Sequence, residues 1–256
     1  ILTFDASGPQ QPRRYHHLQA NAATSARAAP DYGEASRRVR ELIQTAVVRQ
    51  RIADVPLGAF LSGGLDSSIV VACLAQAGGP AVKTFSIGYA DHPRYDETRY
   101  ARLVADHFRT EHHEFRLSFA DVLATIEPLL DHLGEPFADS SLLPTALISR
   151  HTRQHVTVAL SGDGGDELFG GYWRYLGHHY LERYKRLPAL LRRGLIEPAL
   201  AALPSGRTGR RLDRVRQFRK LLRAARHDNA MSRHIAWARI LDDALADGLM
   251  GPELAA

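Results

Sequence analysis

Cysteine is nearly absent from this sequence, since Cys73 is the only one among 256 residues. A single thiol excludes a disulfide framework, so we expect a reducing, cytoplasmic setting and a buried Cys73. No apolar run reaches the ~18 residues that a membrane-spanning helix needs. The thirteen histidines contain no HExxH pattern. Their adjacent pairs at 16–17, 112–113 and 178–179 point apart on a helix or strand, so metal binding by histidine is not expected.

Lysine is also scarce, and Lys83, Lys185 and Lys220 are the only three. Positive charge nevertheless gathers in residues 182–226, which hold 14 Lys or Arg against 3 Asp or Glu. The net charge of this stretch is +11, in a chain whose net charge is +5. The first interpretation is a solvated helix face, and contact with nucleic acid or a partner is the alternative.

Strand and helix patterns alternate through the middle of the chain. Strands are predicted at 55–61, 82–88, 111–117 and 156–160. Helices are predicted at 34–51, 66–76, 96–108 and 118–133, and a fifth helix ends at residue 152. Ser118 is the predicted cap of the fourth helix, and Ser140 or Ser141 is the predicted cap of the fifth. This alternation predicts an α/β fold with a doubly wound parallel sheet. A switch in strand order between the first and fourth strands would bring the turns after them to one crevice.

The two ends of the chain have a different character. Residues 1–33 contain prolines and a run of small residues, which indicates a terminal strand and a linker. Residues 34–181 form the predicted main domain. Residues 182–256 are predicted to be mostly helical, with breaks at Pro188, Pro198 and Pro204. Because the chain starts with Ile1, we expect a fragment or a processed product.

The first dense motif occupies residues 61–68 and reads LSGGLDSS, between a predicted strand and a helix. Its glycines permit a tight turn and a close approach to a ligand. The start of the helix favours an anion. A Walker loop would add a lysine, which is missing here. The cradle therefore depends on backbone N–H groups and hydroxyls, with Asp66 placed to hold magnesium. Such a site favours pyrophosphate leaving as a unit, by cleavage between the α and β phosphates.

The second dense motif occupies residues 161–172 and reads SGDGGDELFGGY, directly after the fourth predicted strand. Five glycines and three carboxylates in twelve residues are costly to order. Crowded carboxylates repel one another unless a cation joins them, and magnesium on ATP is the obvious candidate. A solvated acidic loop is the alternative interpretation.

The first motif resembles the SGGxDSS loop of the PP-loop ATP pyrophosphatases. With the second motif, the chain is similar to the synthetase domain of the glutamine-hydrolysing asparagine synthetase family. The resemblance also includes Val55–Gly58, Thr84–Gly88, Tyr95–Glu97 with Tyr100-Ala101, His112–Glu114, Glu135-Pro136 and Asp139–Ser141. It is strong from 34 to 180 and weaker afterwards. It makes residues 1–33 a remnant of the family's glutaminase domain plus a linker, and residues 182–256 a truncated part of the synthetase domain.

The resemblance implies a role for each matching residue. The adenosine pocket would contain Leu61, Ile87, Ser161 and Gly162. The pyrophosphate would be held by Ser62, Gly63, Gly64, Ser67 and Ser68. Asp66 and Asp166 would hold Mg²⁺, and Asp166 counts with Asp163 as catalytic. Asp163 stands where many relatives have a glutamate, and its carboxylate could accept a proton from the attacking ammonia. A purely structural turn aspartate is the alternative.

The implied reaction is amide formation at the expense of ATP. ATP would adenylate the side-chain carboxylate of aspartate with release of pyrophosphate, and ammonia would then displace AMP to give asparagine. The implied partners are aspartate and ammonia, a homodimer is left open, and neither a membrane nor nucleic acid is expected.

Two parts of the family pattern are missing from this chain. It lacks the glutaminase domain with its N-terminal cysteine, so we expect no glutamine hydrolysis. It also lacks a downstream lysine that stabilises the adenylation transition state, and losing a fixed cation could cost ~10² in rate. We therefore expect ATP·Mg binding with poor asparagine synthesis.

Three alternatives remain. One is a sibling amidoligase, such as a β-lactam synthetase or lasso-peptide cyclase, that adenylates another acid. The second is a tRNA-modifying PP-loop enzyme, which a single cysteine disfavours. The third is a non-catalytic nucleotide-binding module, which the intact Asp66, Ser67, Ser68 and Asp166 disfavour.

Overall fold

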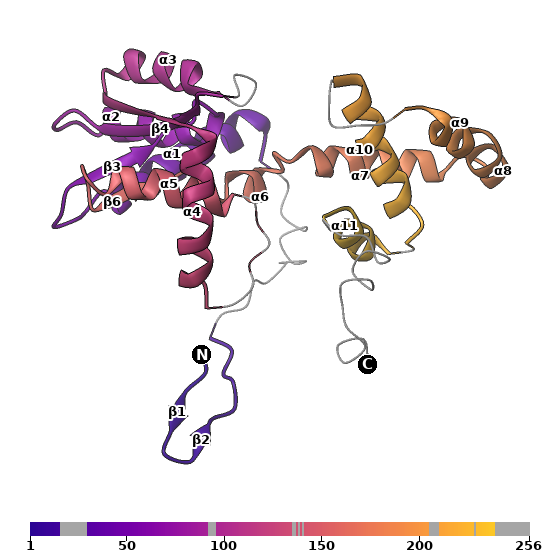
Figure 1. Ribbon diagram of the computed structural model, residues 1–256, viewed down its shortest axis with the longest axis horizontal. Coiled ribbons are helices and arrows are strands. Elements are labelled where there is room, and N and C mark those ends of the chain that lie inside the picture. The colour runs from indigo at the N-terminus through magenta and orange to yellow at the C-terminus, as the bar shows by residue number, and fades with distance from the viewer. Residues whose placement is uncertain are drawn as a thin grey trace. The chain divides into compact units, whose positions relative to one another are not determined.

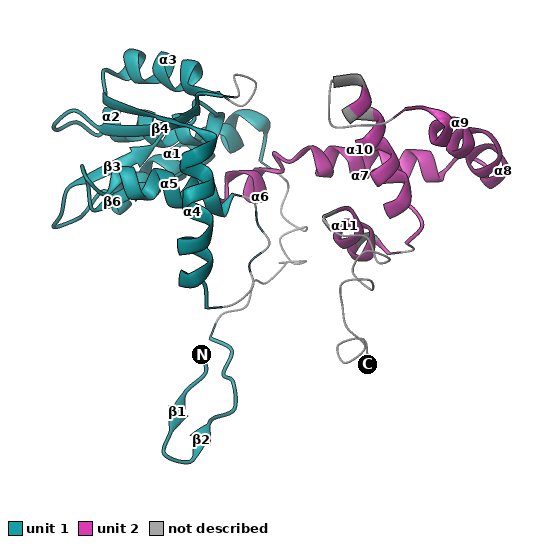
Figure 2. Cartoon of the chain, in the orientation of Figure 1, with its two compact units in different colours: residues 1–162 teal, residues 163–256 magenta. Residues whose placement is uncertain are grey.

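The computed structural model describes residues 1–15, 30–91, 96–134, 137, 139, 141–204, 210–227 and 229–238. The chain forms two compact units, residues 1–162 and residues 163–256 (Figure 2). The predicted linker at 16–29 lies outside the described residues, as do Tyr95, Glu135-Pro136 and Ser140. The domain limits expected from the sequence, at 33 and 181, stay a prediction.

Unit 1 is built on a four-stranded sheet (Figure 1). Its strands are β3 (Leu57–Phe60), β4 (Lys83–Tyr89), β5 (Glu111–Leu117) and β6 (Val158–Leu160). They lie in the order β5-β4-β3-β6, and every neighbouring pair is parallel. The predicted switch in strand order is therefore confirmed, because β3 lies between β4 and β6. The segments that follow β3 and β6 leave the same edge of the sheet side by side.

Five helices accompany this sheet in the described part of unit 1. They are α1 (Tyr32–Gln50), α2 (Leu65–Gln76), α3 (Thr98–Phe108), α4 (Phe119–His132) and α5 (Leu142–Thr152). A small antiparallel hairpin, β1 (Phe4–Asp5) with β2 (Gly8–Pro9), occupies the place of the predicted terminal strand.

Helices cover both faces of the sheet. One face carries Glu114, which binds Arg102 of α3. The opposite face carries Phe115, whose ring stacks on His151 of α5 at a centroid distance of 4.8 Å. Successive residues of a strand point to opposite faces, so α3 and α5 lie on opposite sides of the sheet. The doubly wound α/β fold expected from the sequence is confirmed.

The main core lies on the α3 side. Its buried residues come from α1, α2, α3 and the β3 region: Val47, Ala59, Leu61, Val71, Cys73, Leu74, Ala101 and Ala105. Burial raises the pKa of the Cys73 thiol, which therefore stays protonated at neutral pH. Helix α1 contributes mainly through its last turns, because Val39 and Leu42 of its apolar stripe are exposed.

Of the predicted serine caps, Ser118 is confirmed, whereas Ser140, one of the two candidates at α5, lies outside the described residues. Ser118 begins α4 with a capping box, in which its hydroxyl accepts from the Asp121 N–H and the Asp121 carboxylate accepts from the Ser118 N–H. At α5 the Ser141 side chain makes no cap bond. Ser141 takes the N-cap position with a helical backbone, and its own N–H donates to Asp139 Oδ1 at 2.9 Å.

Unit 2 is helical in its described part. Its helices are α6 (Gly165–Phe169), α7 (Trp173–Lys185), α8 (Ala189–Leu191), the π-helical turn η3 (Arg192–Ile196), α9 (Glu197–Ala202), α10 (Arg210–Ala224) and α11 (Ala230–Ala238). Pro188 and Pro204 flank helices as predicted, whereas the break predicted at Pro198 is wrong. Pro198 lies in the first turn of α9, where a missing N–H is tolerated.

Part of the basic stretch 182–226 has structural roles. The Arg219 guanidinium donates to the carbonyls of Leu200, Ala201 and Leu203, at the end of α9. The last carbonyls of a helix lack the usual i+4 amide partner, so the arginine helps to satisfy this helix terminus, where Leu200 O also accepts from the Leu203 N–H. The solvated-face interpretation is therefore wrong for this residue.

Within the described ranges, none of the helices combines the length and the apolar character that a membrane span requires.

Gly58→Ala tests how closely β3 and β4 pack. The new Cβ would lie 2.7 Å from both the Lys83 carbonyl oxygen and Phe85 Cε2. We expect a loss of about 1–3 kcal/mol in the free energy of unfolding, as for other overpacked sites, measured by urea denaturation. Gly134→Ala is the control, because its Cβ would meet no atom within 4 Å. Equal stability of the two variants would contradict this packing.

Candidate functional site

The first motif forms a closed turn between β3 and α2. Pairing of β3 continues one residue beyond the strand, where the Leu61 N–H donates to the Phe85 carbonyl at 2.8 Å. Helix α2 then begins directly after Gly64. Asp66, Ser67 and Ser68 therefore lie in its first turn, where free N–H groups favour an anion.

The hydroxyl groups of this turn bond to one another and to its backbone. Ser62 Oγ and Ser67 Oγ lie 3.0 Å apart, and Ser62 Oγ accepts from the Gly64 N–H. Ser68 Oγ donates to the Gly64 carbonyl at 2.6 Å. The turn thus holds its shape through its own hydrogen bonds.

Gly63 has a structural role that the sequence did not reveal. Its φ is +81°, and a Cβ there would fall on the backbone of Tyr100 and Ala101. The sequence predicts a tight turn here, which the positive φ confirms, and a close approach to a ligand, which stays a prediction; the packing against α3 was not predicted. In the structure, the space is taken by the first turn of α3.

Gly162 brings the segment after β6 to the same turn. A Cβ on Gly162 would lie 2.7 Å from the Ser67 backbone nitrogen and 2.8 Å from the Asp66 carbonyl carbon. Gly162 therefore packs against the first turn of α2, with Ser161 just before it. The structure thus places these two residues of the second motif at the first motif.

A pocket of about 260 Å³ opens at the carboxyl ends of β3 and β4. Leu61, Ser62 and Ile87 line it, three of the residues that the resemblance assigns to nucleotide binding. Its other lining residues are Phe60, Ser86, Tyr89, Glu97, Thr98, Pro144 and Ile148. Apolar walls with a few polar groups are typical of a small-molecule site.

The rest of the second motif belongs to unit 2 and contains a helix that the sequence did not predict. Helix α6 starts after Gly164 and ends at Gly170, and both glycines have positive φ. Asp163 is exposed and Asp166 is half-buried. Gly171 approaches the Asp166 carboxylate so closely that a Cβ would overlap Oδ1.

A side-chain hydrogen bond links the end of this motif to α6. Tyr172 Oη donates to Glu167 Oε1 at 2.5 Å. This bond to the carboxylate raises the pKa of the Tyr172 phenol to about 12 and lowers the pKa of Glu167.

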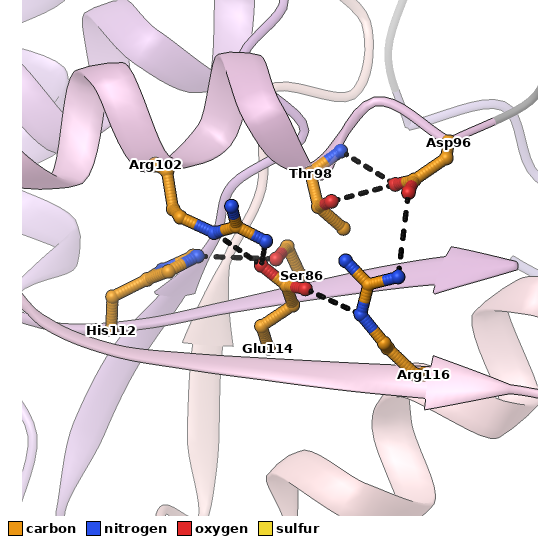
Figure 3. A network of polar contacts seen from close by, with 7 residues as sticks. All are labelled: Ser86, Asp96, Thr98, Arg102, His112, Glu114 and Arg116. Carbon is orange, nitrogen blue, oxygen red and sulfur yellow. Dashed lines mark hydrogen bonds and ion pairs between the residues drawn. The ribbon is translucent and has the colours of Figure 1, made fainter. Parts of the chain in front are cut away.

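A polar network on the α3 face of the sheet leads to the pocket (Figure 3). The Arg102 guanidinium binds Glu114 at 2.6 Å, and Arg116 Nε donates to Glu114 at 3.1 Å. Asp96 accepts from the hydroxyl and the N–H of Thr98, and these bonds lower its pKa. The network ties the start of α3, which lines the pocket, to β5.

Sequence reasoning missed the pocket residues outside the motifs. Ser86 adjoins Ile87 within the segment 84–88 that carries the resemblance, so its neighbourhood was a usable signal. Pro144 and Ile148 gave no signal, because only the packing of α5 on the sheet brings them to the pocket.

The comparisons with known proteins cover most of the chain. The Asparagine synthase family model matches residues 38–247. A putative glutamine-hydrolyzing asparagine synthetase 2 of Methanocaldococcus jannaschii is 43% identical over 154 residues, which cover 60% of this chain and 30% of that protein. Asparagine synthetase 1 of Bacillus subtilis, also named glutamine-hydrolyzing, is 35% identical over 69% of this chain and 27% of its own length.

The chain thus spans less than a third of the length of these relatives. The family model, however, covers well over half of the chain, including both glycine-rich motifs, the pocket and most of unit 2. The chain belongs to the asparagine synthase family.

Proposed function

We propose that this chain binds ATP in the pocket beside the first motif and adenylates the side-chain carboxylate of aspartate, so that ammonia can form asparagine. The observation that carries the proposal is the packing of Gly162 on the first turn of α2. It brings the segment after β6 to the turn after β3, beside an apolar pocket, and this turn is the proposed phosphate site. Family membership supplies the reaction class.

The adenosine part of ATP would lie among Leu61, Ile87, Ser161 and Gly162. The pyrophosphate part would accept hydrogen bonds from the turn formed by Ser62, Gly63, Gly64, Ser67 and Ser68. No lysine occurs in this turn, so backbone N–H groups at the start of α2 carry the interaction.

Asp66 fits a magnesium ligand. It is half-buried in the first turn of α2, beside the proposed phosphate position, and a carboxylate is the hard oxygen donor that Mg²⁺ prefers. Bound Mg²⁺ would neutralise charge on the phosphates. For Asp166, the second proposed ligand and a catalytic residue, the support is the family resemblance.

The proposed chemistry has two steps. A carboxylate oxygen of aspartate attacks the α-phosphorus of ATP, the bond to the β-phosphate bridging oxygen breaks, and pyrophosphate leaves. Ammonia then attacks the acyl carbon and AMP leaves with the bond electrons. We propose Asp163 as the base that accepts the ammonia proton, since it is exposed and its carboxylate suits that role.

Exchange of labelled pyrophosphate into ATP tests the proposal at its first step. We expect exchange that requires aspartate and Mg²⁺, because reversal of adenylation regenerates ATP. Glutamate and a panel of other carboxylic acids are the controls. Exchange with another acid but not with aspartate would favour a sibling amidoligase, and absence of ATP binding would contradict the proposal.

Gly162→Ala tests the contact between the two segments. The added methyl must displace the turn from the Ser67 N–H, so we expect the Kd for ATP to rise about tenfold, the equivalent of one good hydrogen bond. Isothermal titration with ATP measures it. Gly134→Ala, in open space, should leave the Kd unchanged. An unchanged Kd in Gly162→Ala would contradict the proposed site.

Asp66→Asn tests the metal ligand. The neutral amide keeps the size of the side chain and removes its charge, so we expect the exchange rate to fall by ~10² and the Mg²⁺ concentration for half-maximal rate to rise. A magnesium titration of the exchange rate measures both. Asp106→Asn, on the exposed side of α3, is the control. A normal magnesium response in Asp66→Asn would rule out this ligand.

A further inference from the structure

A partly buried chain of hydrogen bonds links Thr110 and β5 to β4. Thr110 Oγ1 and Thr84 Oγ1 lie 2.8 Å apart, and Thr84 Oγ1 lies 2.9 Å from His112 Nδ1. The other ring nitrogen, His112 Nε2, lies 3.2 Å from Ser86 Oγ. Both ring nitrogens of His112 are therefore engaged by hydroxyl groups of β4.

The last member of this chain lines the pocket. Ser86 is only 3% exposed and Thr84 is fully buried, so little water competes for these hydroxyls. The other pocket residues on β3, β4 and α5 are largely apolar, and Ser86 supplies a buried polar group next to Ile87. In such sites a few placed polar groups determine the orientation of the ligand.

We propose that His112 is a positioning residue for nucleotide binding, which holds the Ser86 hydroxyl in the orientation that the ligand requires. This inference rests on the proposed function of the pocket. A serine hydroxyl rotates freely unless a partner fixes it. His112 is that partner, and its own ring is fixed in turn by Thr84.

The surroundings of His112 support a neutral ring. Burial lowers the pKa of His112 below its usual value. A neutral ring has one donor and one acceptor nitrogen, so it gives Ser86 a defined direction. The charged or titratable groups that influence it are Glu114 and His113 on β5 and Arg102 and Asp106 on α3. Figure 3 shows the ring beside Ser86, with Arg102 and Glu114 close by.

His112→Leu and His112→Gln distinguish positioning from structure. Leucine removes both hydrogen bonds, and we expect the Kd for ATP to rise about tenfold while the maximal exchange rate changes little. The glutamine amide reproduces the Nε2 position, so His112→Gln should restore the Kd to within about threefold. His113→Leu is the matched control, because His113 is the next residue of β5 and packs on Phe85, on the opposite face.

A double-mutant cycle ties the effect to Ser86. Ser86→Ala should raise the Kd for ATP as His112→Leu does, and the double variant should bind no more weakly than either single variant. Additive effects would overturn the role, because they would mean that His112 acts elsewhere.

The pH profile gives an independent readout. Protonation makes both ring nitrogens donors, which reverses the direction of any hydroxyl that donated to the ring. Because the pKa of His112 is lowered, the ring is neutral at pH 8, and the Kd for ATP should rise as the pH falls through that pKa. The Kd of His112→Gln, measured at the same pH values, should not show this rise.

The outcomes separate the two proposals. Wild-type chain that binds no ATP overturns the proposed function and this role with it. If the wild-type chain binds ATP and His112→Leu has the same Kd and the same pH profile, this role alone is overturned. If His112→Leu unfolds, His112→Gln and Ser86→Ala carry the test.

Discussion

The position of β3 between two parallel neighbours is the constraint on which the rest of unit 1 depends. Pairing with β4 on one side and β6 on the other fixes where β3 ends, and therefore where the turn at 62–64 begins. The same pairing carries Gly162 to the start of α2. With β6 anywhere else in the sheet, the two glycine-rich motifs of the sequence would not meet.

Much of this arrangement could be predicted from the sequence. The alternation of strand and helix patterns, together with short segments that resemble the family, was enough to predict the parallel sheet, the strand switch and the Ser118 cap. Leu61 and Ile87 do line a pocket at the carboxyl ends of β3 and β4, and their assignment to adenosine, which rests on the resemblance, stays a prediction. Local patterns succeed for the sheet and the Ser118 cap because regular periodicity and turn residues directly reflect backbone geometry.

The misses share a different physical cause. The backbone of α3 fills the space beside Gly63, and α5 brings Ile148 to the pocket. Arg219 was assigned to a solvated face and instead binds carbonyl groups about sixteen residues away. Each of these contacts joins residues that are distant in sequence, and no local pattern encodes such pairs.

The internal hydrogen bonds of the turn at residues 62–68 have a thermodynamic consequence. A flexible loop loses conformational entropy when it closes on a ligand, whereas this turn is already ordered by Ser62, Ser67 and Ser68. The phosphate proposed to bind here would have only to exchange hydroxyl partners, so its binding would have a small entropic penalty. The same preorganisation leaves little room for adaptation, which favours ligands that already have the shape of the turn.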